Sequence, residues 1–173
     1  MEVYRRHLPH IVLRGHPLFI TFCTVGRWRL PPAARTIALK HCLHEHAKTT
    51  FVHVAVIMPD HVHLVLTLEE DAPPLSLILK SIKGVSARRI NQFLHSRGEV
   101  WQGESMDHVI RAEAGVHQTC AYVTQNPVRA GLVKCPEAYP WLWRAHVEGR
   151  GIERRDPLRT AWERRTDKSV CPT

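Results

Sequence analysis

The stretch FVHVAVIMPDHVHLVLTL, residues 51–68, constrains the fold more than any other part of the chain. It holds two runs rich in β-branched residues, separated by the turn-forming sequence Met58-Pro59-Asp60. This pattern predicts an antiparallel hairpin. Because successive side chains of a strand point to opposite faces, His61 and His63 are predicted to project together from an otherwise apolar strand.

The remaining pattern predicts strands and helices over the first 145 residues. The predicted elements are a strand at 17–25, a helix from Pro31 to about 49, a helix from Leu75 to about 95, an extended segment at 107–111 and a helix from Glu113 to Asn126. The last helix is expected to stop before Pro127, because a residue that precedes proline is disfavoured in the helical region. This order predicts an α+β domain, an antiparallel sheet with helices packed on one face.

The composition changes near the C-terminal end. From His146 onward the sequence is polar and basic. We therefore expect a folded domain at 1–145 and a basic, polar tail at 146–173.

The charge balance narrows the class of partner. The chain has 24 Lys and Arg against 16 Asp and Glu, a formal net charge of +8 at pH 7. Such an excess favours contact with a polyanion such as nucleic acid. A merely soluble basic surface has the same composition, so charge alone does not decide between them.

Cysteine usage and hydropathy indicate a reducing, aqueous compartment. The five cysteines are scattered and never form a C-x-x-C pair, which argues against a disulfide framework and a cysteine zinc site. The longest hydrophobic stretch, residues 51–68, is broken by Pro59-Asp60 and three histidines, so no membrane span is expected. We expect a cytoplasmic protein.

Two imidazoles on one strand face have two interpretations. They are either structural histidines hydrogen-bonded to neighbours or a metal-binding pair, since neutral imidazoles two residues apart can both reach one divalent ion. A catalytic metal site also needs a third ligand from elsewhere and open coordination positions. The pattern alone leaves both interpretations open.

The segment CAYVTQNPVRAGLV, residues 120–133, offers groups that could complete such a site. On a helix, Tyr122 and Asn126 are four residues apart and share a face with Gln118, while positions 116, 120 and 123 form an apolar stripe. The polar face suits a nucleophile and a ligand, and it equally suits a solvated surface. Of the three tyrosines, only Tyr122 lies in a predicted helix with a ligand-type residue one turn away.

A set of cations is predicted to position the phosphates of a nucleic acid. Four lie on the helix that begins at Leu75 and two bracket the tyrosine helix: Lys80, Lys83, Arg88, Arg89, Arg111 and Arg129. Singly, each is better explained as a solvated charge. As a set they predict DNA binding that weakens steeply with salt.

Five blocks of sequence resemble one known family. MPDHVHLVL, SIKGVSARRIN, VWQGESMDHVIR, AYVTQNPVRAGLV and YPW occur here in that order. The order is similar to that of the single-tyrosine HUH transposases, above all their REP-associated branch (REP, repetitive extragenic palindrome). The similarity covers about residues 4–145. Asp60 departs from the more usual Asn before the first histidine, and His108 stands where Arg is common.

The resemblance implies a fold and a set of site residues. The implied fold is a ferredoxin-like antiparallel sheet, the HUH transposase fold, with the histidines on a central strand. His61 and His63 are implied as metal ligands, Asn126 as a third, amide-bearing ligand, and Tyr122 as the nucleophile.

The resemblance also implies a reaction. The implied enzyme is a DNA transposase and endonuclease that uses Mg²⁺ or Mn²⁺. It would cleave and rejoin single-stranded or hairpin DNA, REP elements included, through a 5′-phosphotyrosine intermediate, and it would be nucleoid-associated when bound to DNA.

Alternatives stay open beside this enzyme. One is a non-catalytic DNA-binding protein that keeps the same fold, and another is a hydrolytic metalloenzyme that uses water as its nucleophile. A homodimer also stays open, because related transposases include dimers in which the tyrosine helix completes the site of the partner.

Overall fold

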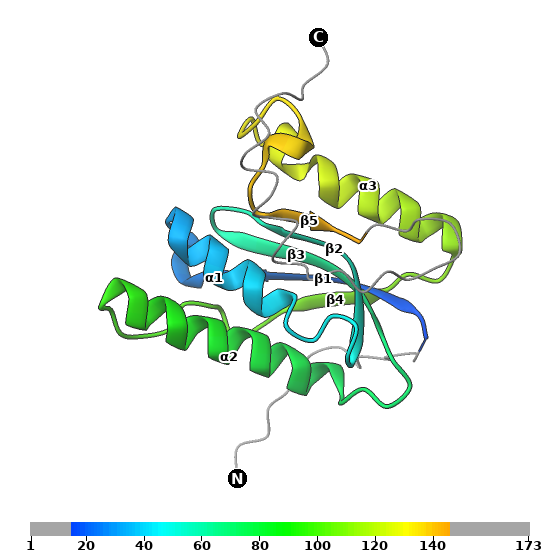
Figure 1. The fold of residues 1–173 in the computed structure, drawn as a ribbon, viewed down its shortest axis with the longest axis horizontal. Coiled ribbons are helices and arrows are strands. Elements are labelled where there is room, and N and C mark those ends of the chain that lie inside the picture. Colours follow the sequence, from blue (N-terminus) through cyan, green and yellow to red (C-terminus); the bar gives the residue numbers. More distant parts are fainter. Residues whose placement is uncertain (1–14, 146–173) are drawn as a thin grey trace.

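The computed structural model describes residues 15–145, so the predicted tail at 146–173 lies outside the described residues. Five strands, three α-helices and two short 3-10 turns make up this part of the chain (Figure 1). In chain order they are β1 (Pro17–Cys23), η1 (Val25–Arg27), α1 (Pro32–Cys42), β2 (Thr50–Ile57), β3 (His61–Leu68), α2 (Leu75–Leu94), β4 (Met106–Val109), α3 (Glu113–Arg129), η2 (Pro136–Ala138) and β5 (Leu142–Arg144).

The strands form one antiparallel sheet in the order β4-β1-β3-β2-β5. β2 and β3 pair as the predicted hairpin, with Ile57 opposite Val62 beside the turn. The first six regular elements, β1-α1-β2-β3-α2-β4, have the split βαβ connections of a ferredoxin-like fold, and β5 is added at the edge next to β2. The α+β fold class is confirmed, and β3, which carries the histidine pair, is the central strand.

Helices cover both faces of the sheet. α1 and α2 lie on one face, where Leu39 and Ile78 share a core with Leu64 of β3. α3 lies across the sheet from them, and its Val123 shares a second, smaller core with Val65 of β3 (Figure 1). The prediction that helices pack on one face is correct for α1 and α2 and wrong for α3. The physical reason is that the second face of the sheet carries Val54 and Val56 of β2 beside Val65 of β3, and these apolar side chains also need a cover.

The end of α3 also differs from the prediction. The helix does not stop before Pro127 but continues through it to Arg129. It ends where Gly131 adopts a left-handed conformation (φ 67°), and the amides of Gly131 and Leu132 donate to the carbonyls of Val128 and Pro127. This Schellman-type end supplies hydrogen bonds that a stop at residue 126 would lack, which outweighs the local preference of the residue before proline.

Two further expectations concern thiols and membranes. Cys23, Cys42 and Cys120 are free, whereas Cys135 is disulfide-bonded, which the scattered spacing of the cysteines did not indicate. None of the helices in residues 15–145 is long and apolar enough to cross a membrane.

Candidate active site

The two histidines project together from β3 toward the face that α3 covers. His61 and His63 alternate with the fully buried Val62, which belongs to the core beneath α1 and α2. The two imidazole rings lie with their centroids 4.7 Å apart. The predicted pairing of the rings on one face is therefore present in the structure.

Each ring is oriented by a hydrogen bond at Nδ1. In His61 this atom lies 2.7 Å from Oδ1 of Asp60, and in His63 it lies 2.8 Å from Oγ1 of Thr21 on β1. Neither Nε2 atom has a hydrogen-bond partner among residues 15–145. Metal-binding histidines commonly use one ring nitrogen for a second-sphere contact and the other for the ion. This donor arrangement fits a divalent cation held by the two Nε2 atoms.

Burial sets the protonation state of His63. Only 9% of the residue is exposed. Burial, and then electrostatic interaction with His61 and Arg27, lower the pKa of His63 to about 4. The ring is therefore neutral at pH 7, which is the form that can coordinate a metal.

Tyr122 of α3 lies beside this pair. Its ring centroid is 6.4 Å from that of His63, and Phe19 of β1 contacts both rings, at 5.4 Å from His63 and 6.4 Å from Tyr122. Tyr122 is 44% exposed, and its hydroxyl has no hydrogen-bond partner in the described part of the chain. The other described tyrosine, Tyr139, is buried, and its hydroxyl donates to the Ile57 carbonyl at 2.8 Å. Of the two, only Tyr122 presents a phenol that a substrate can reach.

Asn126 lies one turn beyond Tyr122 on α3. Within residues 15–145, its side chain forms no hydrogen bond with either imidazole. Its side-chain amide donates to the Tyr122 carbonyl at 3.2 Å, which leaves the side-chain oxygen free to accept another contact. No group of three His, Cys, Asp or Glu side chains in this part of the chain is placed to hold a metal. A cation at the histidine pair would need ligands of another kind, such as an amide, water or phosphate oxygen.

The predicted cations are spread over the molecule. Arg129 is brought to the site, since its guanidinium carbon lies 5.0 Å from the centre of the Tyr122 ring. Arg111 is exposed in the link between β4 and α3. Lys83 instead ties α2 to the loop before β4, donating to the Gly103 carbonyl at 2.8 Å and to Oγ of Ser105 at 3.2 Å.

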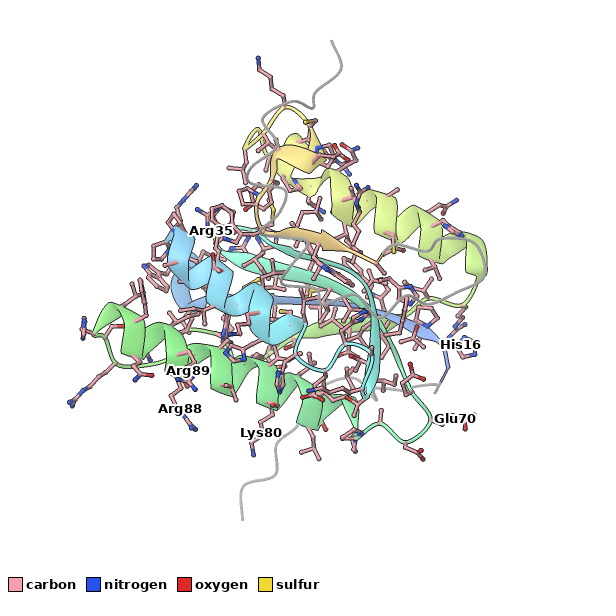
Figure 2. The ribbon with its side chains drawn as sticks, viewed as in Figure 1. His16, Arg35, Glu70, Lys80, Arg88 and Arg89 are labelled. Atoms are coloured by element: carbon pink, nitrogen blue, oxygen red, sulfur yellow. The ribbon has the colours of Figure 1, made fainter. Side chains whose placement is uncertain are left out.

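The other three cations lie on α2, across the sheet from the histidine pair. They are Lys80, Arg88 and Arg89, and all three are exposed. Figure 2 shows that Lys80 and Arg88 project away from the sheet. If they contact DNA, they do so on a surface separate from Tyr122.

Sequence reasoning did not single out Phe19, Thr21 or Arg27. Phe19 and Thr21 alternate with buried residues of β1, so their shared face was predictable, but not the register that sets Thr21 opposite His63. Arg27 forms an ion pair with Asp60 at 3.0 Å. Its place depends on the conformation of a short turn, for which no pattern in the sequence gives a signal.

The chain is similar in sequence to a known family and to curated proteins. The family model described as "Transposase IS200 like" matches residues 20–126. The chain is 28% identical over 101 residues to a putative REP-associated tyrosine transposase of Haemophilus influenzae. The match covers 53% of this chain and 57% of that protein. The chain is also 29% identical over 92 residues to the REP-associated tyrosine transposase of Escherichia coli, and this match covers 52% of each protein. The chain thus spans about half the length of the curated relatives it matches.

One solved structure has a similar fold. It is a REP-associated tyrosine transposase bound to a REP hairpin. The two structures superpose with a TM-score of 0.61 at 21% sequence identity, over 90% of this chain and 99% of the other.

Proposed function

Because this chain belongs to the IS200-like transposase family, we propose that it cleaves and rejoins single-stranded or hairpin DNA through a covalent phosphotyrosine intermediate on Tyr122. The observation that carries the proposal is the half-exposed Tyr122 ring 6.4 Å from the ring of His63, with a hydroxyl that has no partner in the described part of the chain. A water-using hydrolase would not need a phenol at that place.

In the proposed reaction the Tyr122 oxygen attacks the phosphorus of the scissile linkage. The phenol loses its proton and the bond from phosphorus to the 3′ oxygen breaks. The 5′ side stays bound to tyrosine, and the 3′ oxygen leaves as a hydroxyl. Because a phenolate is a better leaving group than an alkoxide, the phosphotyrosine stays reactive toward another strand's 3′-hydroxyl, which rejoins the DNA.

We propose that His61 and His63 hold a divalent cation, Mg²⁺ or Mn²⁺, through their Nε2 atoms, with the side-chain oxygen of Asn126 as a third ligand. When bound, such an ion polarises the phosphate and stabilises charge on its oxygens. An ordinary phenol has a pKa of about 10 and is a weak nucleophile at neutral pH, so the attack needs this help.

We propose that DNA is the partner and that the cations hold its backbone. The position of Arg129 over the Tyr122 ring supports a contact with the scissile phosphate. Arg111 would contact the strand next to α3, and Lys80, Arg88 and Arg89 would bind more distant phosphates, whereas the ammonium of Lys83 already donates to the loop before β4. The similar structure binds a REP hairpin, so REP-like hairpins are the substrate we propose to test first.

The test uses the whole chain with a labelled hairpin oligonucleotide that carries single-stranded extensions, in the presence of Mn²⁺. We expect a covalent protein–DNA adduct on a denaturing gel. Tyr122→Phe should bind the DNA but form no adduct, and Tyr139→Phe is the matched control that should still form it. Adduct formation by Tyr122→Phe would refute the nucleophile. Cleavage by that variant without an adduct would favour a hydrolase, and binding without cleavage by the wild type would favour a non-catalytic DNA-binding protein.

A further inference from the structure

The turn that follows β1 has an unusual backbone. Gly26 and Arg27 both have positive φ angles, 60° and 57°. Glycine adopts this left-handed region without strain, but for arginine it is uncommon and unfavourable. A non-glycine residue in this conformation persists only where its surroundings fix it, and such residues cluster at functional sites.

Thr24 fixes this turn to the residue that precedes the histidine pair. Thr24 is fully buried, and its amide donates to the Asp60 carbonyl at 2.9 Å. Its hydroxyl lies 2.7 Å from the Trp28 carbonyl and 3.0 Å from the Asp60 carbonyl. Thr24 therefore holds the turn against Asp60 through its amide and hydroxyl, without the side chain of Arg27.

The side chains of the turn form a chain of contacts that ends at His61. Nη1 of Arg27 lies 2.8 Å from Sγ of Cys23, and Nε lies 3.0 Å from Oδ2 of Asp60. The other carboxylate oxygen of Asp60, Oδ1, lies 2.7 Å from Nδ1 of His61. Both oxygens of Asp60 are thus engaged, one by a cation and one by the imidazole.

We propose that Arg27 and Asp60 are positioning residues for His61. They fix its ring so that Nδ1 carries the proton and Nε2 presents its lone pair to the face that holds Tyr122. That this lone pair binds a divalent cation rests on the proposed function. A carboxylate can only accept, so the imidazole nitrogen beside it must donate. Arg27 prevents the carboxylate from rotating away.

Another ion pair of the protein provides the comparison. Arg144 and Glu137 also lie 3.0 Å apart, but both are about half exposed, and neither bonds to an imidazole among residues 15–145. In the Arg27–Asp60 pair, the Asp60 side chain is only 25% exposed, and the His61 ring that it contacts is 17% exposed. An exposed pair such as Arg144–Glu137 contributes little to stability and has no neighbouring group to orient.

The test has two measurements on the whole chain. The first is the tautomer of His61 in the metal-free protein at pH 8.5, from the ¹⁵N chemical shifts of the imidazole. The second is the affinity for Mn²⁺ by titration calorimetry. The unfolding temperature of each variant is recorded beside them as a check on its stability. The variants are Asp60→Asn and Arg27→Gly, with Glu137→Gln as the matched control.

We expect the wild type to hold the Nδ1–H tautomer of His61. Asp60→Asn should give a mixture, because an amide can turn either its oxygen or its NH₂ group toward the ring. It should also weaken Mn²⁺ binding by about tenfold or more, as is typical when a second-sphere partner is removed. Arg27→Gly should weaken Mn²⁺ binding without lowering the unfolding temperature, because glycine relieves the left-handed backbone. Glu137→Gln should change neither measurement.

An unchanged tautomer in Asp60→Asn would overturn the inference. So would an Arg27→Gly variant that loses thermal stability but keeps the wild-type tautomer, because that combination describes a purely structural ion pair. A wild type that shows the expected tautomer but binds no Mn²⁺ supports the positioning role and refutes the metal part of the proposed function. The two failures are therefore distinguishable.

Discussion

Acidification should destabilise the protein through His63, and the size of the effect can be worked out from the structure. Burial lowers the pKa of this residue from 6.5 to about 4 in the folded state. Between pH 6.5 and pH 4 the unfolded chain therefore binds a proton that the folded protein does not. The free energy of unfolding falls as pH falls through this window.

The largest possible effect is about 3 kcal/mol, since one pKa unit corresponds to about 1.4 kcal/mol. At pH 5 the loss from His63 should be about 2 kcal/mol, because the unfolded residue is almost fully protonated there and the folded residue is not. This is a large part of the net stability of a small domain, which is typically about 5 to 15 kcal/mol.

The assay is urea unfolding of metal-free protein at several values between pH 7 and pH 5, for wild type and His63→Gln. The free energy of wild type should fall relative to that of the variant by about 2 kcal/mol over this range. Carboxylates that titrate in the same range cancel in the difference. His44→Gln, which removes an exposed imidazole, is the matched control and should follow the wild type. Parallel curves for wild type and His63→Gln would refute the reasoning.

Three further measurements test other parts of the structure. Gly131→Ala should lower stability by about 1 kcal/mol in urea unfolding, because φ is 67° at this position and nothing lies close enough to clash with the added methyl group; an unchanged midpoint would refute the Schellman-type end. Tyr139→Phe should cost about 1 to 2 kcal/mol, since it leaves the buried Ile57 carbonyl without its hydroxyl donor, and a neutral effect would contradict that contact. Arg129→Gln should reduce the slope of log affinity for hairpin DNA against log salt by about 1, whereas an equal slope would exclude a phosphate contact.

The order of residues along short stretches of sequence was enough to predict the central hairpin and the family. The β2–β3 hairpin follows from two β-branched runs around a Pro-Asp turn, and its alternation correctly put His61 and His63 on one face. The membership of the transposase family, expected from five short blocks, is also confirmed. In each case the signal lies in short runs of neighbouring residues.

What sequence reasoning missed depends on contacts between distant segments. The face that α3 covers is defined by Val54 and Val56 of β2 together with Val65 of β3, and a strand pattern cannot assign this face to a particular helix. The contact of Thr21 with His63 requires the register of β1 against β3, which only the assembled sheet defines. The roles predicted for Tyr122 and Asn126 stay predictions; the ring of Tyr122 lies 6.4 Å from that of His63.

The cores on the two faces of the sheet differ in size, so the histidines of β3 and Tyr122 of α3 are not held equally firmly. The strand that carries the imidazoles packs into the large core beneath α1 and α2, whereas α3 is held mainly through the small core around Val123. Local opening is easiest where the fewest apolar contacts must be broken. α3 can therefore detach at a lower free-energy cost than global unfolding, carrying the phenol away while the histidine strand stays folded. Amide hydrogens of α3 should then exchange with solvent well before those of β3.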